Sequence, residues 1–188
     1  MKIALTGTPG TGKTSIAYIL ERNHSIQIVN LHQFALEEDL IEDFDQKRRS
    51  DIIDIDELNK RFIKKTYDKT SVIIEGHLSH FLKSVNMVIV LRCHPAMLRT
   101  RLETKQWAEE KIYENIEAEI LDIIESEAVD IHTMERVIEI DTTNNTVEDL
   151  AKIINSLIIS RFKEKEKYKP GQIDWTDVLL DDTFFHGV

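Results

Sequence analysis

The sequence contains only one cysteine, three prolines and six glycines among 188 residues. The single cysteine, Cys93, excludes an internal disulfide, and its position in the apolar run 87–93 predicts a buried, unreactive thiol. No apolar run approaches the roughly 20 residues that a membrane span requires. Because the chain enters an apolar, strand-like segment at its first residue, we expect no signal peptide and a cytoplasmic protein without membrane contacts.

Positive charge is also scarce. The chain has 24 Lys and Arg against 34 Asp and Glu, a net charge of -10 at pH 7. This balance argues against broad electrostatic binding to nucleic acid, so no direct contact with DNA is expected. An acidic surface suits a basic partner protein, but solubility alone explains it equally well. The length predicts one domain, and we expect a monomer.

One stretch combines glycines with a lysine in a specific order. Residues 7–14, GTPGTGKT, fit the pattern G-x-x-x-x-G-K-[ST], the phosphate-binding loop of P-loop NTPases. A strand-like segment (1–6) precedes it and a helical segment (15–22) follows. This order points backbone amides and a helix N-terminus at the phosphates. The alternative, a glycine turn that binds nothing, leaves the flanking elements unexplained.

The loop pattern assigns a role to each of its polar positions. Lys13 is expected to reach the β- and γ-phosphates of ATP. Thr14 is expected to ligate Mg²⁺ through its hydroxyl, and Ser15 to donate to the α-phosphate. Gly10 and Gly12 allow the backbone to approach the phosphates without an intervening Cβ. The cofactor expected is therefore Mg²⁺, bound together with ATP.

A second carboxylate is needed near the metal, at the end of a neighbouring strand. Glu75 closes the apolar run 72–75 and precedes Gly76 and His77. We predict that Glu75 contacts Mg²⁺ through water and that His77 orients an attacking water or hydroxyl. The alternatives are a surface carboxylate at a strand end and a structural histidine.

Apolar runs alternate with helical patterns along the chain, which predicts a doubly wound α/β domain with a five-stranded parallel sheet. The further strands expected are 26–29, 70–75, 87–92 and 137–140, and the further helices are 95–105, 109–128 and 146–162. The span 30–67 is too long for a simple crossover and is interpreted as an insert. It is either a solvated, flexible face or a segment that closes over a second substrate. After residue 165 the composition changes, and this tail either packs on the domain, which we favour, or docks a partner.

Phosphoryl transfer also requires cations around the moving phosphate. Four basic residues follow the strand 87–92 or end it: Arg92, Arg99, Arg101 and Lys105. Arg101 and Lys105 share a helix face. The cluster either supplies phosphate contacts, with Lys105 on the ATP phosphates in a short lid, or consists of surface helix charges paired with Glu103 and Glu109. The guanine-specific pattern N-K-x-D is absent, and the polar loop 141–145 suits an adenine edge.

These residues together resemble a known family. The loop GTPGTGKT, Asn30 with the stretch 35–38, the sequence EGH at 75–77, and RLETK at 101–105 followed by ENI at 114–116 resemble adenylate kinase isoenzyme six and its archaeal relatives. The resemblance covers roughly residues 1–160. It implies a P-loop kinase domain (1–165) with an AMP-side insert at about 30–53, a lid at about 104–114, and a C-terminal extension (166–188).

The resemblance implies a nucleoside monophosphate kinase that converts ATP and AMP to ADP, with broad specificity and ATPase activity. It also implies a role in maturation of the small ribosomal subunit, bound to a basic ribosomal protein of the pre-ribosomal particle. It places ATP contacts at the loop residues and Lys105. Leu36 stands where many members carry an arginine that grips the monophosphate, and Arg48 or Arg49 is a candidate substitute. The alternative is therefore a nucleotide-switched assembly ATPase with little AMP kinase activity.

Overall fold

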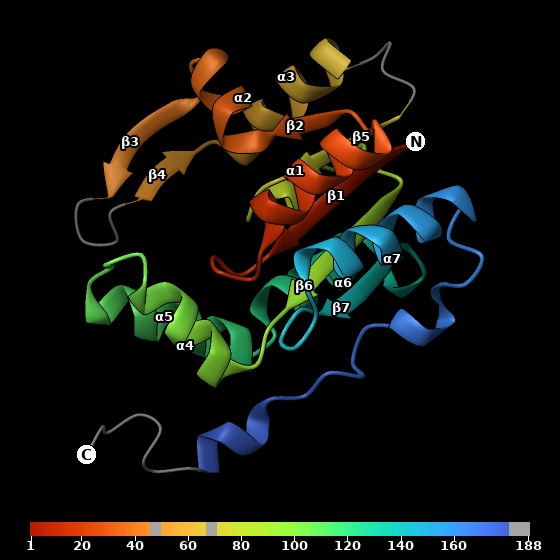
Figure 1. Cartoon of the computed structure of the whole chain (residues 1–188). Helices are drawn as coiled ribbons and strands as arrows, with labels where there is room; N and C mark the ends of the chain where they lie inside the picture. The colour runs from red at the N-terminus through yellow and green to blue at the C-terminus, as the bar shows by residue number, and fades with distance from the viewer. Residues whose placement is uncertain (46–49, 67–70, 181–188) are drawn as a thin grey trace.

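The structure, a computed structural model, describes residues 1–45, 50–66 and 71–180. Its centre is a parallel sheet of five strands in the order β2-β5-β1-β6-β7 (Figure 1). The strands are β1 (Lys2–Gly7), β2 (Ile28–Asn30), β5 (Val72–Glu75), β6 (Met87–Arg92) and β7 (Val137–Asp141). The predicted doubly wound fold is confirmed. Since the strands are parallel, the carboxyl ends of β1, β5 and β6 meet at one edge, where such folds bind ligands.

Helices cover both faces of the sheet (Figure 1). On one face pack α1 (Lys13–His24) and α7 (Val147–Ile159), against Ile3 and Leu5 of β1. On the other face pack α2 (Leu31–Glu37), α3 (Ile55–Thr66) and α6 (Ile123–His132), against Ala4 of the same strand. This alternation follows from the two-residue period of a strand, and it explains why the strands are apolar on both sides.

The segment predicted as one helix over 109–128 consists of two. The helix α5 (Glu109–Ile120) ends before Asp122, which has a φ of 53°, and α6 follows. Aspartate tolerates this left-handed conformation better than most residues, and the carboxylate of Asp122 is paired with Arg92. The isoleucine period continues across the break, so hydrophobic spacing alone does not reveal it. The helix α4 (Pro95–Glu103) packs beside α5 on Leu98 and Leu102.

The described part of the insert forms regular secondary structure. After α2 come two antiparallel strands, β3 (Ile41–Asp45) and β4 (Ser50–Ile53), and then α3. Its anchor is apolar, because Leu58 and Phe62 of α3 are buried and Phe34 of α2 meets Phe62 edge to face, with ring centroids 5.5 Å apart. The candidate acceptor residues Arg48 and Arg49 lie outside the described residues.

The described part of the tail packs on the domain, as predicted. The backbone amides of Gly171, Gln172 and Ile173 donate to carboxylates of α6 and β7. Trp175 and Val178 pack on the apolar cluster formed by α4 and α5. Residues 181–188, which include two phenylalanines, lie outside the described part of the chain. None of the helices in the described ranges is long and apolar enough to cross a membrane.

Candidate active site

The phosphate loop connects β1 to α1 at the carboxyl edge of the sheet. Gly10 has a φ of 100°, and a Cβ added to it would come within 2.7 Å of Leu98. Gly12, with a φ of 101°, is the N-cap of α1. Both positions require glycine, because L-residues with side chains avoid this backbone conformation. The loop therefore presents bare backbone to the cleft at the start of α1.

Lys13 points back into this loop. Its Nζ donates to the carbonyl oxygens of Gly7 at 2.7 Å and Thr8 at 3.0 Å. Burial lowers the pKa of Lys13 to about 8, with Lys105 adding to the effect, although the carboxylates of Glu75 and Glu119 oppose it. Among the described residues, the hydrogen-bond partners of Lys13 are these two carbonyls and no carboxylate contacts it directly, so a polyphosphate placed here would supply a counter-charge.

Glu75 ends β5 and is almost fully buried. Its Oε2 lies 3.4 Å from the Thr14 hydroxyl, which donates to it, and its Oε1 accepts a hydrogen bond from the Asn30 side-chain amide. A hydroxyl and a carboxylate are the hard oxygen ligands that Mg²⁺ takes, with nucleotide phosphates and waters completing its shell. The donor set therefore fits Mg²⁺ carried by a nucleotide. Asn30 as a partner of Glu75 was not predicted from the chemistry.

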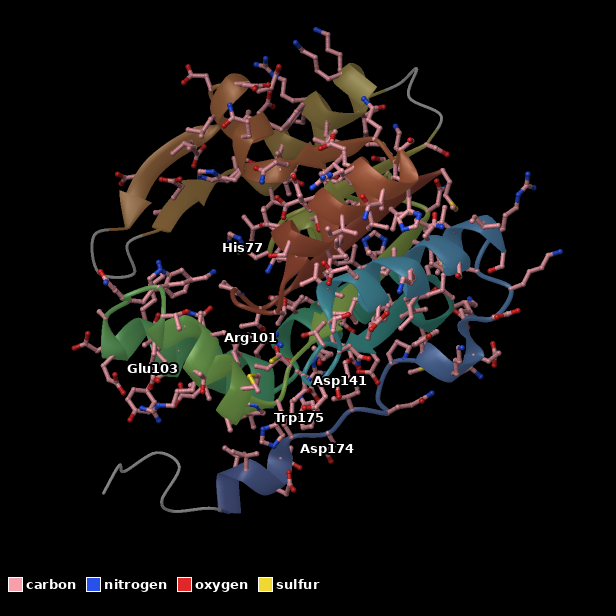
Figure 2. The ribbon with its side chains drawn as sticks, in the orientation of Figure 1. His77, Arg101, Glu103, Asp141, Asp174 and Trp175 are labelled. Atoms are coloured by element: carbon pink, nitrogen blue, oxygen red, sulfur yellow. The ribbon has the colours of Figure 1, made fainter. Side chains whose placement is uncertain are left out.

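His77 follows β5 and is exposed at the wall of the cleft (Figure 2). Although the side chain is open to the cleft, the protein around it disfavours the charged ring and the ammonium of Lys13 adds a repulsion, which together lower the pKa of His77 to about 4. The imidazole is therefore neutral near pH 7. The hydroxyl of Thr6 donates to the carbonyl of His77 at 3.2 Å and fixes the backbone that carries it. A neutral imidazole here can orient a hydroxyl or water but has little capacity to hold a proton.

Arg101 and Lys105 come from α4 and the turn after it. The Arg101 guanidinium donates to the Thr142 hydroxyl at 3.2 Å and to its carbonyl at 2.8 Å, which ties α4 to the loop after β7. The Nζ of Lys105 lies 5.4 Å from the ring centroid of Trp107. Both cations line the cleft, and Arg101 is shown in Figure 2.

One cleft of about 990 Å³ brings the predicted site residues together. Its lining includes Gly10, Gly12, Lys13, Thr14, Ser15, Glu75, His77, Arg101 and Lys105. The insert contributes His32, Asp51 and Ile53, and His32 is paired with Asp51 at 2.7 Å. The loop after β7 contributes Thr142 and Asn145. The phosphate loop therefore forms the floor of the cleft. The insert forms one wall, and α4, the turn after it and α5 form the other.

Two of the predicted phosphate cations lie elsewhere. Arg92 is 2% exposed and is surrounded by the carboxylates of Glu119, Asp122, Glu125 and Glu139. Burial disfavours its charge, but Glu119, Asp122 and Glu125 outweigh burial and raise the pKa of Arg92. Arg99 pairs with Glu103 and Glu109 on the surface. The expectation that Arg92 joins a phosphate-binding cluster was therefore wrong. For Arg99 the alternative, a surface helix charge paired with Glu103 and Glu109, is confirmed.

The Arg92 cluster also touches the phosphate loop. Glu119 accepts a hydrogen bond from the Thr8 hydroxyl, a contact that sequence reasoning missed. The sequence did contain one sign of this buried cluster: a charged residue, Glu139, inside the short apolar strand β7. A buried carboxylate requires a partner, and Arg92 on the neighbouring strand is one.

Comparison with known proteins identifies the family of the chain. A family described as AAA domain (AAA_18) matches residues 3–122. A "Putative adenylate kinase" of Methanosarcina acetivorans is 40% identical over 94% of this chain and 98% of its own. Proteins with the same description from Pyrococcus abyssi and Archaeoglobus fulgidus are 43% and 42% identical, over 95% and 96% of this chain and 93% and 95% of their own. The chain belongs to this adenylate kinase family.

Solved structures that resemble this member of the family share its fold at low sequence identity. A shikimate kinase from Acinetobacter baumannii superposes with a TM-score of 0.58 at 16% identity, covering 85% of this chain and 93% of that one. A deoxyadenosine kinase from M. mycoides superposes with a TM-score of 0.53 at 15% identity, covering 86% of this chain and 100% of that one. These similarities show the P-loop kinase fold.

Proposed function

We propose that the protein is a magnesium-dependent nucleoside monophosphate kinase, which transfers the γ-phosphoryl group of ATP to AMP or a related monophosphate. The observation that carries the proposal is the cleft itself, because its lining joins the phosphate loop, the Thr14–Glu75 pair, the insert and the lid in one space. The relatives described as adenylate kinases support the same activity.

In this proposal, each cation has a place in the transfer. An oxygen of the acceptor phosphate forms a bond to the γ-phosphorus while the bond to the β-γ bridging oxygen breaks, and ADP leaves. Lys13 would hold the β- and γ-phosphates, and Thr14 and Glu75 would hold Mg²⁺, which would offset the negative charge of the phosphates. Arg101 and Lys105 approach the transferred group from the other wall, where charge develops in the transition state.

A second candidate is a nucleotide-switched ATPase that acts in assembly of the small ribosomal subunit. The described part of the insert lines the cleft with His32, Asp51 and Ile53, but with no arginine or lysine, and Leu36 is 48% exposed. The lack of a cation in this part of the cleft favours weak binding of a monophosphate. A neutral His77 would then orient water, and the net charge of -10 suits a basic ribosomal partner.

One assay separates the two candidates. ADP formation is measured with Mg·ATP alone, then with AMP, CMP, UMP or GMP, and then with the basic ribosomal protein. A kinase forms ADP only when a monophosphate is present. If ATP turns over only with the ribosomal protein and no monophosphate is phosphorylated, the kinase proposal fails and the ATPase proposal stands. Lys13→Ala is expected to abolish either activity.

A further inference from the structure

Glu119 is a buried carboxylate whose two oxygens face different parts of the molecule. It lies on α5 and is 2% exposed. Its Oε1 accepts from Arg92 Nε at 2.9 Å and from the backbone amide of Cys93 at 2.9 Å. Its Oε2 accepts from the hydroxyl of Thr8, which is also buried. One oxygen therefore serves the core and the other serves the phosphate loop.

Thr8 occupies a central place in that loop. Its carbonyl oxygen accepts from Lys13 Nζ at 3.0 Å, from the amide of Thr11 at 3.2 Å and from the Thr11 hydroxyl at 2.9 Å. The orientation of this one peptide group thus sets where the ammonium and the turn of the loop lie. Because its side chain is tied to Glu119, a rotation of the Thr8 peptide would break a charge-assisted hydrogen bond inside the protein.

Glu119 is the strongest carboxylate partner of Arg92, but other carboxylates also reach the guanidinium. Asp122 and Glu125, the latter at 2.8 Å, remain to balance the single cation without Glu119. A further buried carboxylate is costly to retain merely as a core charge. The contact that distinguishes Glu119 from the other three is the hydrogen bond to the loop.

We propose that Glu119 is a positioning residue for phosphoryl transfer, which holds the phosphate loop in its binding geometry through the Thr8 hydroxyl while Arg92 and the Cys93 amide fix Glu119 itself. This proposal rests on the function proposed above. Glu119 stands on the helix that follows the turn carrying Lys105, so the same side chain joins the phosphate loop to the wall that faces it. Placement of the loop within a fraction of an ångström is what the transfer rate depends on.

The test uses Thr8→Val, which removes the hydroxyl at nearly constant volume and leaves the charges around Arg92 untouched. Thr8→Ser is the matched control, because it keeps the donor. Glu119→Gln is the second variant. For each protein we would measure kcat and KM for ATP, the Kd of Mg·ATP by calorimetry, and the midpoint of thermal unfolding. A charge-assisted hydrogen bond predicts that Thr8→Val and Glu119→Gln each lower kcat/KM by roughly 10- to 100-fold, and that Thr8→Ser recovers most of that loss.

A purely structural contact would lower the unfolding midpoint and leave the kinetics of the folded protein at the wild-type level; that result would overturn the proposal. So would a loss confined to Glu119→Gln, since the role would then not pass through Thr8. If the wild-type protein forms no ADP, the proposed function fails, and the binding data decide the inference by themselves. Weaker Mg·ATP binding in Thr8→Val, restored in Thr8→Ser, supports it, and equal binding contradicts it.

Discussion

The Thr14 hydroxyl donates to the Glu75 carboxylate across 3.4 Å, which joins the first turn of α1 to the end of β5. Thr14 is exposed to the cleft, whereas Glu75 is nearly buried. A metal ion bound between nucleotide and protein would therefore meet the hydroxyl directly and the carboxylate behind it. In such a site the carboxylate would be a partner that tunes the metal affinity.

Glu75→Gln is expected to raise the Mg²⁺ concentration for half-maximal activity by about tenfold or more, because the amide retains a hydrogen bond but loses the negative charge. The measurement is a magnesium titration of ADP formation at saturating ATP. Glu21→Gln, at an exposed position of α1, is the control and should titrate like the wild type. A wild-type magnesium curve in Glu75→Gln would remove Glu75 from the metal site.

The affinity for ATP is expected to fall as the pH rises above about 8. Lys13 has its pKa lowered to about 8 in the free protein, and a bound polyphosphate would raise it, so binding takes up a proton in this pH range. The lowered pKa also reduces the free energy of unfolding of the nucleotide-free protein below pH 8, where Lys13 is charged. This loss of stability disappears as the pH rises toward 10.5, the ordinary pKa of lysine.

Calorimetry in two buffers of different ionisation enthalpy measures this uptake. The number of protons taken up on ATP binding should be near zero at pH 6.5 and substantial at pH 8.5. Lys13→Arg stays protonated throughout, so any complex that it forms should show no uptake from this position. Equal proton uptake by both proteins at pH 8.5 would mean that another group titrates.

The kinetics should show no inflection from His77 between pH 5.5 and 8, because the pKa of this residue is lowered to about 4 by desolvation and by Lys13. His77→Ala is expected to lower kcat by about tenfold, the value of one neutral hydrogen bond. His77→Asn, which keeps a neutral polar group, should lose less. A pH profile whose acidic limb near pH 6.5 disappears in His77→Asn would show instead that the imidazole exchanges a proton.

Glu139→Gln should flatten the pH dependence of stability. Burial and the neighbouring Glu125 raise the pKa of Glu139 to about 8. A raised carboxyl pKa contributes stability that is present below about pH 4.5 and is lost as the pH rises toward 8. Between pH 5.5 and 8.5 the free energy of unfolding of the wild type should therefore fall by roughly 1–3 kcal/mol, and that of the variant should not. Urea unfolding at the two pH values measures the difference, and parallel losses would contradict it.

The residues that build the phosphate loop could be predicted because their chemistry is local. A glycine at a φ of 100°, a lysine and a hydroxyl must occupy fixed offsets in one turn, and the strand before and the helix after them have clear patterns. Glu75 and His77 were found for a related reason, since the end of a buried strand leads to the edge of a parallel sheet.

Arg92 shows where this reasoning stops. Arg92 lies at the end of β6, and this position suggested a phosphate contact. However, Arg92 is on the same face of the strand as Val88 and Val90, and this face packs in the core beside α6. The partners that keep it there come from α5, α6 and β7, far away in sequence. Only tertiary structure brings them together, as it does for Glu119 and Thr8.

The sole thiol of the chain lies against α4 and α5 with no exposed surface, and burial raises the pKa of Cys93 to about 11. Such a thiol scarcely reacts with maleimides or disulfide reagents. New cysteines placed on the hairpin of the insert and on α4 can therefore carry a pair of fluorescent or spin labels without first replacing the natural one. The distance between the two walls of the cleft, and its change on addition of nucleotide, can be followed in the otherwise native sequence.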